Sequence, residues 1–184
     1  PSLMEPCLQS GSIDGYCVGE PFNSSAVQNG IGVILAESAD LSPMHPEKAL
    51  VVSNAFLENH GETHIEVIRA VDEAAALCET PTGREEAVTI LSQSHYLGID
   101  PELIRSSLFA GDSEGNAKMT SESFHVFSHP EVNRPTADKA NWLVTHMRNA
   151  GLLASVDTRS GPPLSNIFRE DLFEEATSRL AVAS

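Results

Sequence analysis

Two glycines frame a short apolar run in the stretch Asp14-Gly15-Tyr16-Cys17-Val18-Gly19-Glu20-Pro21-Phe22-Asn23. The run between the glycines has the composition of a strand, and glycine at each end permits the tight turns that bound strands. Proline soon after Gly19 suits the first turn of a helix, because the N–H that it lacks needs no partner there. The stretch therefore predicts a strand that turns into a helix at the edge of an open α/β sheet.

Similar signals extend this pattern along the chain. A short helix is expected before Gly11, and the helix after Pro21 should stop at Asn29-Gly30, a good C-terminal signal. Residues 31–36 and 48–53 are short apolar runs, each of which predicts a buried strand. Together these segments predict an α/β fold, and three strands supply only part of a sheet.

The remainder of the chain reads as mostly helical. From Glu62 to Cys78 apolar residues recur at three- and four-residue spacing, which predicts a long amphipathic helix. Further helices are expected before residue 151, and a last one over residues 169–181. Gly-, Ser- and Asn-rich residues 110–122 predict a loop, and residues 160–166 a linker. The starts of four helices are marked by capping residues, namely Ser53, Thr80, Asp100 and Thr136.

A lysine opens one of the strand candidates in the stretch His45-Pro46-Glu47-Lys48-Ala49-Leu50. Burying an ammonium group is costly unless an anion neutralises it, so Lys48 is a candidate anion ligand. The alternative is an edge lysine whose stem lies on the surface and whose charge stays in water. In the first stretch, the N-terminus of the helix after Glu20-Pro21 would direct backbone amides towards a ligand. The alternative is an ordinary turn from a strand to a helix.

Composition narrows the function classes. The formal net charge of −15 over 184 residues repels nucleic-acid backbones and anionic lipid. No apolar run is long enough to cross a bilayer. The chain opens at Pro1 in patterned sequence, and we expect it to be a piece of a longer or processed protein. An anion would bind here only where local charge and amide dipoles overcome the general field.

Motifs for catalysis, metals and nucleotides are missing from the sequence. Three widely spaced cysteines predict free, mostly buried thiols rather than a disulfide framework or a zinc site. His60 and His64 stand at helical spacing across a probable helix start, where a solvated helix end is favoured over metal ligation. No nucleophile elbow, dinucleotide fingerprint or phosphate-binding loop occurs. We therefore predict no catalytic residue, no metal and no cofactor.

Taken together, Gly15 to Pro21 and the later run His45 to Leu50 resemble the solute-binding proteins of nitrate ABC transporters. Bicarbonate-binding proteins and cytoplasmic nitrate sensors are similar. The likeness continues through residues 84–87 and 91–96 and weakens around residues 142–153. It covers most of this chain but only the C-terminal half of the family's length. Phe22 departs from the family, which usually has tryptophan at that position.

The resemblance implies a periplasmic-binding-protein-like (type II) clamshell that closes on a small oxyanion. Residues 1–42 would then end the second lobe and return through the hinge, and residues 43–184 would pack on the first lobe. Lys48 matches the lysine that pairs with the anion in nitrate binders, whereas bicarbonate binders carry an acidic residue there. The resemblance also implies that the Gly19-Glu20-Pro21 turn contributes backbone groups to the cleft.

The leading hypothesis is therefore a periplasmic, non-enzymatic binding component for nitrate or nitrite that delivers its anion to ABC permease subunits. A cytoplasmic nitrate or nitrite sensor of the same fold, acting on a regulatory protein, is the first alternative. An enzyme related to pyrimidine synthesis is a more distant one, because no element of this sequence matches a cofactor lysine or a metal cluster.

Overall fold

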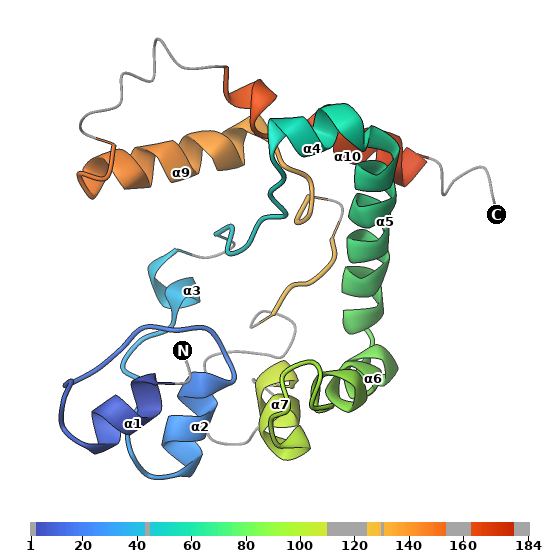
Figure 1. Ribbon diagram of the computed structural model, residues 1–184. Helices are drawn as coiled ribbons and strands as arrows, with labels where there is room; N and C mark the ends of the chain where they lie inside the picture. The colour runs from blue at the N-terminus through green and yellow to red at the C-terminus, as the bar shows by residue number, and fades with distance from the viewer. Residues whose placement is uncertain (1–2, 43–44, 110–124, 130, 154–162, 179–184) are drawn as a thin grey trace. The chain divides into compact units, whose positions relative to one another are not determined.

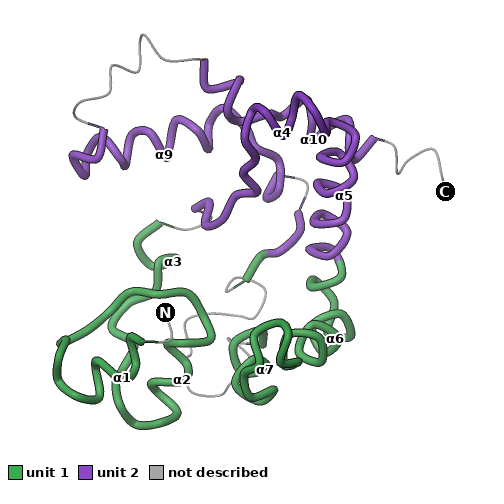
Figure 2. The backbone as a smooth tube through the Cα atoms, in the orientation of Figure 1, with its two compact units in different colours: residues 1–44, 77–126 green, residues 45–76, 127–184 purple. Residues whose placement is uncertain are grey.

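The computed structural model describes residues 3–42, 45–109, 125–129, 131–153 and 163–178, and its elements are labelled in Figure 1. The chain divides into two compact units, shown in Figure 2. Unit 1 comprises residues 1–44 and 77–126, and unit 2 comprises residues 45–76 and 127–184. Helices supply the regular structure of the described residues in both units.

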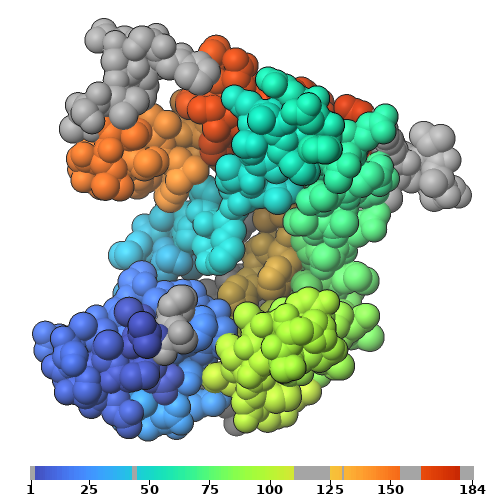
Figure 3. Space-filling view, in the orientation of Figure 1, coloured from blue at the N-terminus to red at the C-terminus, as the bar shows by residue number. Residues whose placement is uncertain are grey.

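Unit 1 is built around the contact between two consecutive helices, α6 and α7. Helix α7 also packs against α2. The side chains of α6 and α7 form one yellow-green cluster in the space-filling view (Figure 3). Val88 and Ile104 are 2% exposed and Ala26 is 4% exposed, so they form the small apolar core of this unit. Its helices are α1 (Met4–Gln9), α2 (Phe22–Gln28), α3 (Ser38–Leu41), α6 (Pro81–Leu91) and α7 (Pro101–Leu108).

Unit 2 buries Ile65, Ala140 and Ala176, one from each of three helices. The longest of these, α5, has its last two residues in unit 1. None of the described helices combines the length and apolar character that a bilayer-spanning helix requires. The elements are α4 (Asn54–Asn59), α5 (Gly61–Cys78), α9 (Ala137–Asn149), the 3₁₀ turn η1 (Leu164–Asn166) and α10 (Glu170–Ser178).

The predicted helix starts are confirmed with their caps. The side chains of Ser53, Thr80, Asp100 and Thr136 each accept a hydrogen bond from a backbone N–H of the first turn that follows. These bonds satisfy amides that the helix itself leaves without partners. Three predicted helix ends are also confirmed. Gly11, Gly30 and Gly151, which follow these ends, each have φ between 65° and 73°.

The predicted α/β fold with a partial sheet is wrong for the described residues, which contain no strand. The segments 12–19, 31–36 and 48–53 have no regular secondary structure. Val33, Leu35 and Val51 are 80%, 92% and 81% exposed, so these apolar runs are not buried. Strand propensity is local, but a strand forms only where a second segment provides a hydrogen-bonded ladder. None of the described residues provides one for these three runs.

Other expectations meet the structure only in part. The loop predicted over 110–122 lies outside the described residues. The linker predicted over 160–166 ends in η1, and only residues 163–166 of it are described. The last helix runs over Glu170–Ser178 within the described part of the chain, where we expected residues 169–181.

A buried arginine holds unit 1 together through backbone carbonyls. Arg84, which is 6% exposed, donates from Nε to Cys78 O at 2.7 Å and from Nη1 to Leu108 O at 3.0 Å. Nη2 donates to His125 O at 3.5 Å. The guanidinium therefore joins the end of α5, the end of α7 and the segment at residue 125, none of which are neighbours in sequence.

A lysine plays the same part in unit 2. The ammonium group of Lys139, on α9, donates to the carbonyl oxygens of Glu131, Val132 and Arg134. Burial lowers the pKa of this ammonium group. The three bonds fix the loop that precedes α9 against the first turns of that helix.

Gly83 allows α6 to begin directly against the end of α5. A Cβ at position 83 would lie 1.9 Å from the carbonyl oxygen of Leu77. We predict that Gly83→Ala lowers the free energy of unfolding by about 1–3 kcal/mol, because backbone must move to admit the methyl group. Gly61→Ala is the matched control, since a Cβ there meets no atom within 4 Å. Urea unfolding followed by circular dichroism measures both, and equal midpoints for the two variants would contradict the prediction.

Candidate functional site

The candidate anion ligand Lys48 lies in an exposed segment of unit 2. Its side chain is 80% exposed, and its Nζ forms an ion pair with Glu47 Oε1 at 2.6 Å. The segment from His45 to Ser53 has no regular secondary structure and leads into α4. The ammonium group is therefore largely open to solvent and is paired with the neighbouring carboxylate. The structure therefore shows the exposed charge of the second alternative, without the expected strand, and the anion-binding role of Lys48 stays a prediction.

A stack of aromatic rings connects this segment to α9. The imidazole of His45 lies over the indole of Trp142, with centroids 6.2 Å apart and ring planes inclined by 17°. Trp142 in turn contacts His146 at 4.3 Å between centroids. The indole is thus flanked by one ring from the segment that carries Lys48 and one ring from its own helix.

The Gly19-Glu20-Pro21 turn lies in unit 1, where it starts α2. The Glu20–Pro21 peptide bond is cis. The N–H of Ser24 donates to Glu20 Oε2 at 3.1 Å, and Asn23 Nδ2 donates to Val18 O at 2.7 Å. A first-turn amide, which we expected to face a ligand, is therefore bound by a carboxylate of the chain itself. A ligand-binding role for Gly19, Glu20 and Pro21 stays a prediction.

Acidic side chains dominate the electrostatics around this turn. Burial raises the pKa of the Tyr16 phenol, and the negative charges of Glu5 and Glu20 raise it further. Burial also raises the pKa of the Glu37 carboxyl, with added repulsion from Asp40 and Glu20. The charge of Glu20 thus raises the pKa of two other groups, Tyr16 and Glu37. The electrostatic field at the turn therefore disfavours a further negative charge.

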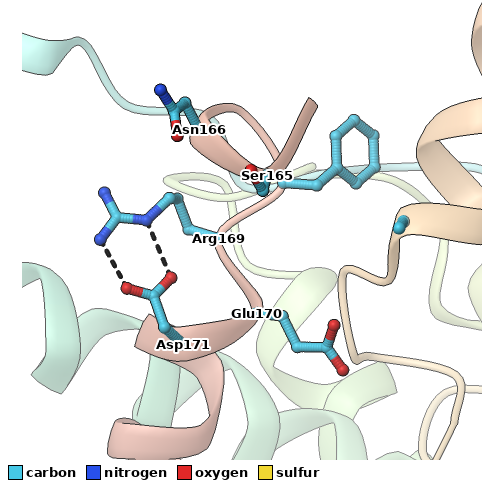
Figure 4. Close-up of a pocket in the computed structure, with 7 residues that line it drawn as sticks. Ser165, Asn166, Arg169, Glu170 and Asp171 are labelled. Carbon is cyan, nitrogen blue, oxygen red and sulfur yellow. Dashed lines mark hydrogen bonds and ion pairs between the residues drawn. The ribbon is translucent and has the colours of Figure 1, made fainter. Parts of the chain in front are cut away.

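A hollow of about 650 Å³ in unit 2 was missed by sequence reasoning. Residues 165–166 and 168–171 line it together with Ala137. Figure 4 shows Arg169 and Asp171 directed at one another across two hydrogen bonds, of 2.8 Å and 2.6 Å. Glu170 pairs instead with Arg134 at 2.9 Å. Each of these charged lining groups therefore already has an ion-pair partner, and the residues of the hollow carry no sequence signal that could have marked it.

The histidines and cysteines give no ligand set. His60 ends α4 and His64 is 6% exposed on α5, and both rings contact Phe56, so the expected solvated helix end is wrong for His64. Cys7 and Cys78 are half-buried and Cys17 is exposed, and all three are free. Within the described ranges, no three His, Cys, Asp or Glu residues converge as a metal site would require.

Comparison with known proteins assigns the chain to a family. The NMT1-like family matches residues 1–92, which include the Gly19-Glu20-Pro21 turn and Lys48, and the chain belongs to this family. The resemblance to nitrate-binding proteins is confirmed by curated relatives of modest identity over nearly the whole chain. No solved structure matches the chain.

Three relatives illustrate the range. The nitrate/nitrite binding protein NrtA of Synechococcus elongatus is 29% identical over 98% of this chain and 41% of its own length. The nitrate import ATP-binding protein NrtC of Synechocystis is 30% identical over 98% of this chain and 27% of its own. The bicarbonate transport ATP-binding protein CmpC of Synechococcus elongatus is 32% identical over 82% of this chain and 22% of its own length. The chain thus spans about two fifths or less of these relatives.

We predict that Glu20→Ala weakens the start of α2 and lowers the pKa of Tyr16. The variant leaves the Ser24 amide without its acceptor, which lowers the free energy of unfolding by about 1 kcal/mol. It also removes a negative charge that raises the Tyr16 pKa. Chemical denaturation measures the first effect and ultraviolet absorbance of the phenolate measures the second.

Glu86→Ala is the control, because it removes the same charge from an exposed position on α6. A Tyr16 titration that is the same in both variants would show that Glu20 does not act on the phenol.

Proposed function

We propose that this chain contributes Lys48 to the anion site of a nitrate or nitrite binding component of an ABC transporter. No chemistry on the anion is required, because binding needs only the replacement of its water by a cation and hydrogen-bond donors. The proposal is supported by the NMT1-like family match over residues 1–92 and by relatives named for nitrate or nitrite binding.

The choice of anion rests on Lys48. The names of the relatives divide between nitrate and bicarbonate, so identity alone does not select one. A fixed ammonium group suits a permanently charged, weakly basic anion such as nitrate. Bicarbonate can donate a proton and is better matched by an acidic side chain, which the sequence resemblance implies for bicarbonate binders. Lys48 is a cation at this position, and this is the observation that carries the proposal.

The exposed position of Lys48 is compatible with this role. The side chain of Lys48 is 80% exposed, so its ammonium group is accessible to a small anion. The exposed ion pair with Glu47 neutralises this charge only in part. The general charge of −15 repels nitrate elsewhere, so local cations decide where an anion binds.

Partners and compartment follow from the same assignment. We assign the protein to the periplasm, with ABC permease subunits as the partners that receive the anion. The transport proteins among the relatives favour this assignment over a cytoplasmic sensor, because their names refer to import and transport.

We predict that Lys48→Glu abolishes nitrate binding and leaves the fold intact, because it places like charge at the site. Isothermal titration of nitrate, nitrite and bicarbonate into this chain measures this. Lys48→Arg keeps the positive charge at this position and is the control, which should retain binding. Unchanged nitrate affinity in Lys48→Glu would remove the assignment.

We further predict that Glu47→Gln strengthens nitrate binding, by up to about fivefold, because the carboxylate competes with the anion for the ammonium group. The pair is largely exposed, which limits the gain. Glu58→Gln removes the same charge ten residues from Lys48 in the sequence and is the control. An affinity that falls in Glu47→Gln would mean that the carboxylate supports the site instead.

A further inference from the structure

The segment that carries Lys48 lacks the backbone pairing that normally orients a ligand-binding side chain. Residues 45–53 belong to no helix or strand. Two of its contacts are internal, namely His45 Nδ1 at 3.1 Å from Pro46 O and the Lys48–Glu47 ion pair. Neither contact joins the segment to another element, so neither can fix where Lys48 lies relative to the rest of unit 2.

The stack of His45 on Trp142 does join the segment to another element. The 6.2 Å separation and 17° inclination fall within the range of offset aromatic stacking. His45 is three residues from Lys48, and three residues span at most about 10 Å even when fully extended. A fixed imidazole at His45 therefore confines the backbone of Lys48 to a small region of unit 2.

Trp142 is itself held in place. It stands one turn after Lys139, whose ammonium group binds three carbonyls of the preceding loop. Thr136 caps the same helix by accepting from Lys139 N–H. The half of α9 that carries the indole is thus anchored to its surroundings, and the indole offers a fixed surface to His45.

We infer that Trp142, through its stack on His45, positions Lys48 for the anion. Trp142 is a positioning residue and does not touch the ligand. The inference rests on the proposed function and adds a residue that determines affinity. Restricting the segment before the anion arrives lowers the conformational entropy that binding must remove. His146 also contacts the indole, but it belongs to the same helix, so this contact does not join the segment to α9.

Nitrate titration calorimetry with this chain tests the inference. We expect Trp142→Ala and His45→Ala each to weaken nitrate binding by about three- to tenfold, which is the worth of one aromatic pair. Trp142→Phe retains a ring and should restore most of the affinity. His146→Ala is the matched control and should bind as the wild type does.

A double-mutant cycle separates positioning from general damage. If the two rings act through one contact, the His45→Ala/Trp142→Ala double variant binds nitrate no more weakly than either single variant. Additive losses, or a loss in His146→Ala equal to that in Trp142→Ala, would assign the effect to α9 as a whole and overturn the inference. Should Trp142→Ala fail to fold, the comparison of His45→Ala with His146→Ala decides the question.

The failure of the inference and that of the proposed function give different results. Wild-type affinity in His45→Ala and Trp142→Ala, with binding lost in Lys48→Glu, overturns the positioning role alone. No nitrate binding by the wild type overturns the proposed function, and the positioning role with it.

Discussion

Cationic side chains that bind backbone carbonyl groups are the interaction on which both units depend. Arg84 binds three carbonyls in unit 1, and Lys139 binds three in unit 2. Arg69 adds a bond of 3.3 Å to the carbonyl of Ala176. Polar backbone groups away from water need partners, and the described residues have no sheet to supply them. Charged donors perform that role here, and a charged donor forms a stronger bond than a neutral one.

This use of cations shapes the candidate site. The chain has 11 lysines and arginines against 26 acidic residues, and several of these cations hold loops and helix ends. Arg105 and Arg134 each pair with two carboxylates. Lys48 differs from them in being 80% exposed and paired only with the adjacent residue among the ion pairs found in the described part of the chain. An acidic protein can present an attractive point to an anion only where such a charge is left accessible.

Sequence predicted the helices well and the rest poorly, for a physical reason. Capping at Ser53 or Thr136 is decided within four residues, so it can be read locally. Strand pairing depends on distant segments, and the three apolar runs gave no such information. The carbonyl partners of Arg84 lie 6, 24 and 41 residues away, which no local pattern reveals. The motif predicted Lys48 as the residue of interest and left open whether it is buried or exposed, whereas the stack of His45 on Trp142 required the structure.

The exposed run at residues 31–36 has a consequence for the protein in concentrated solution. Ile31-Gly32-Val33-Ile34-Leu35-Ala36 contains no charge and no proline, it is rich in β-branched residues, and its last four residues are exposed. The N–H groups of Ile31 and Gly32 both donate to Ala26 O, and the exposed residues that follow have the composition of segments that stack into cross-β fibrils. Aggregation of this chain on its own would therefore begin at this run, and a charge introduced at Val33 or Leu35 would suppress it.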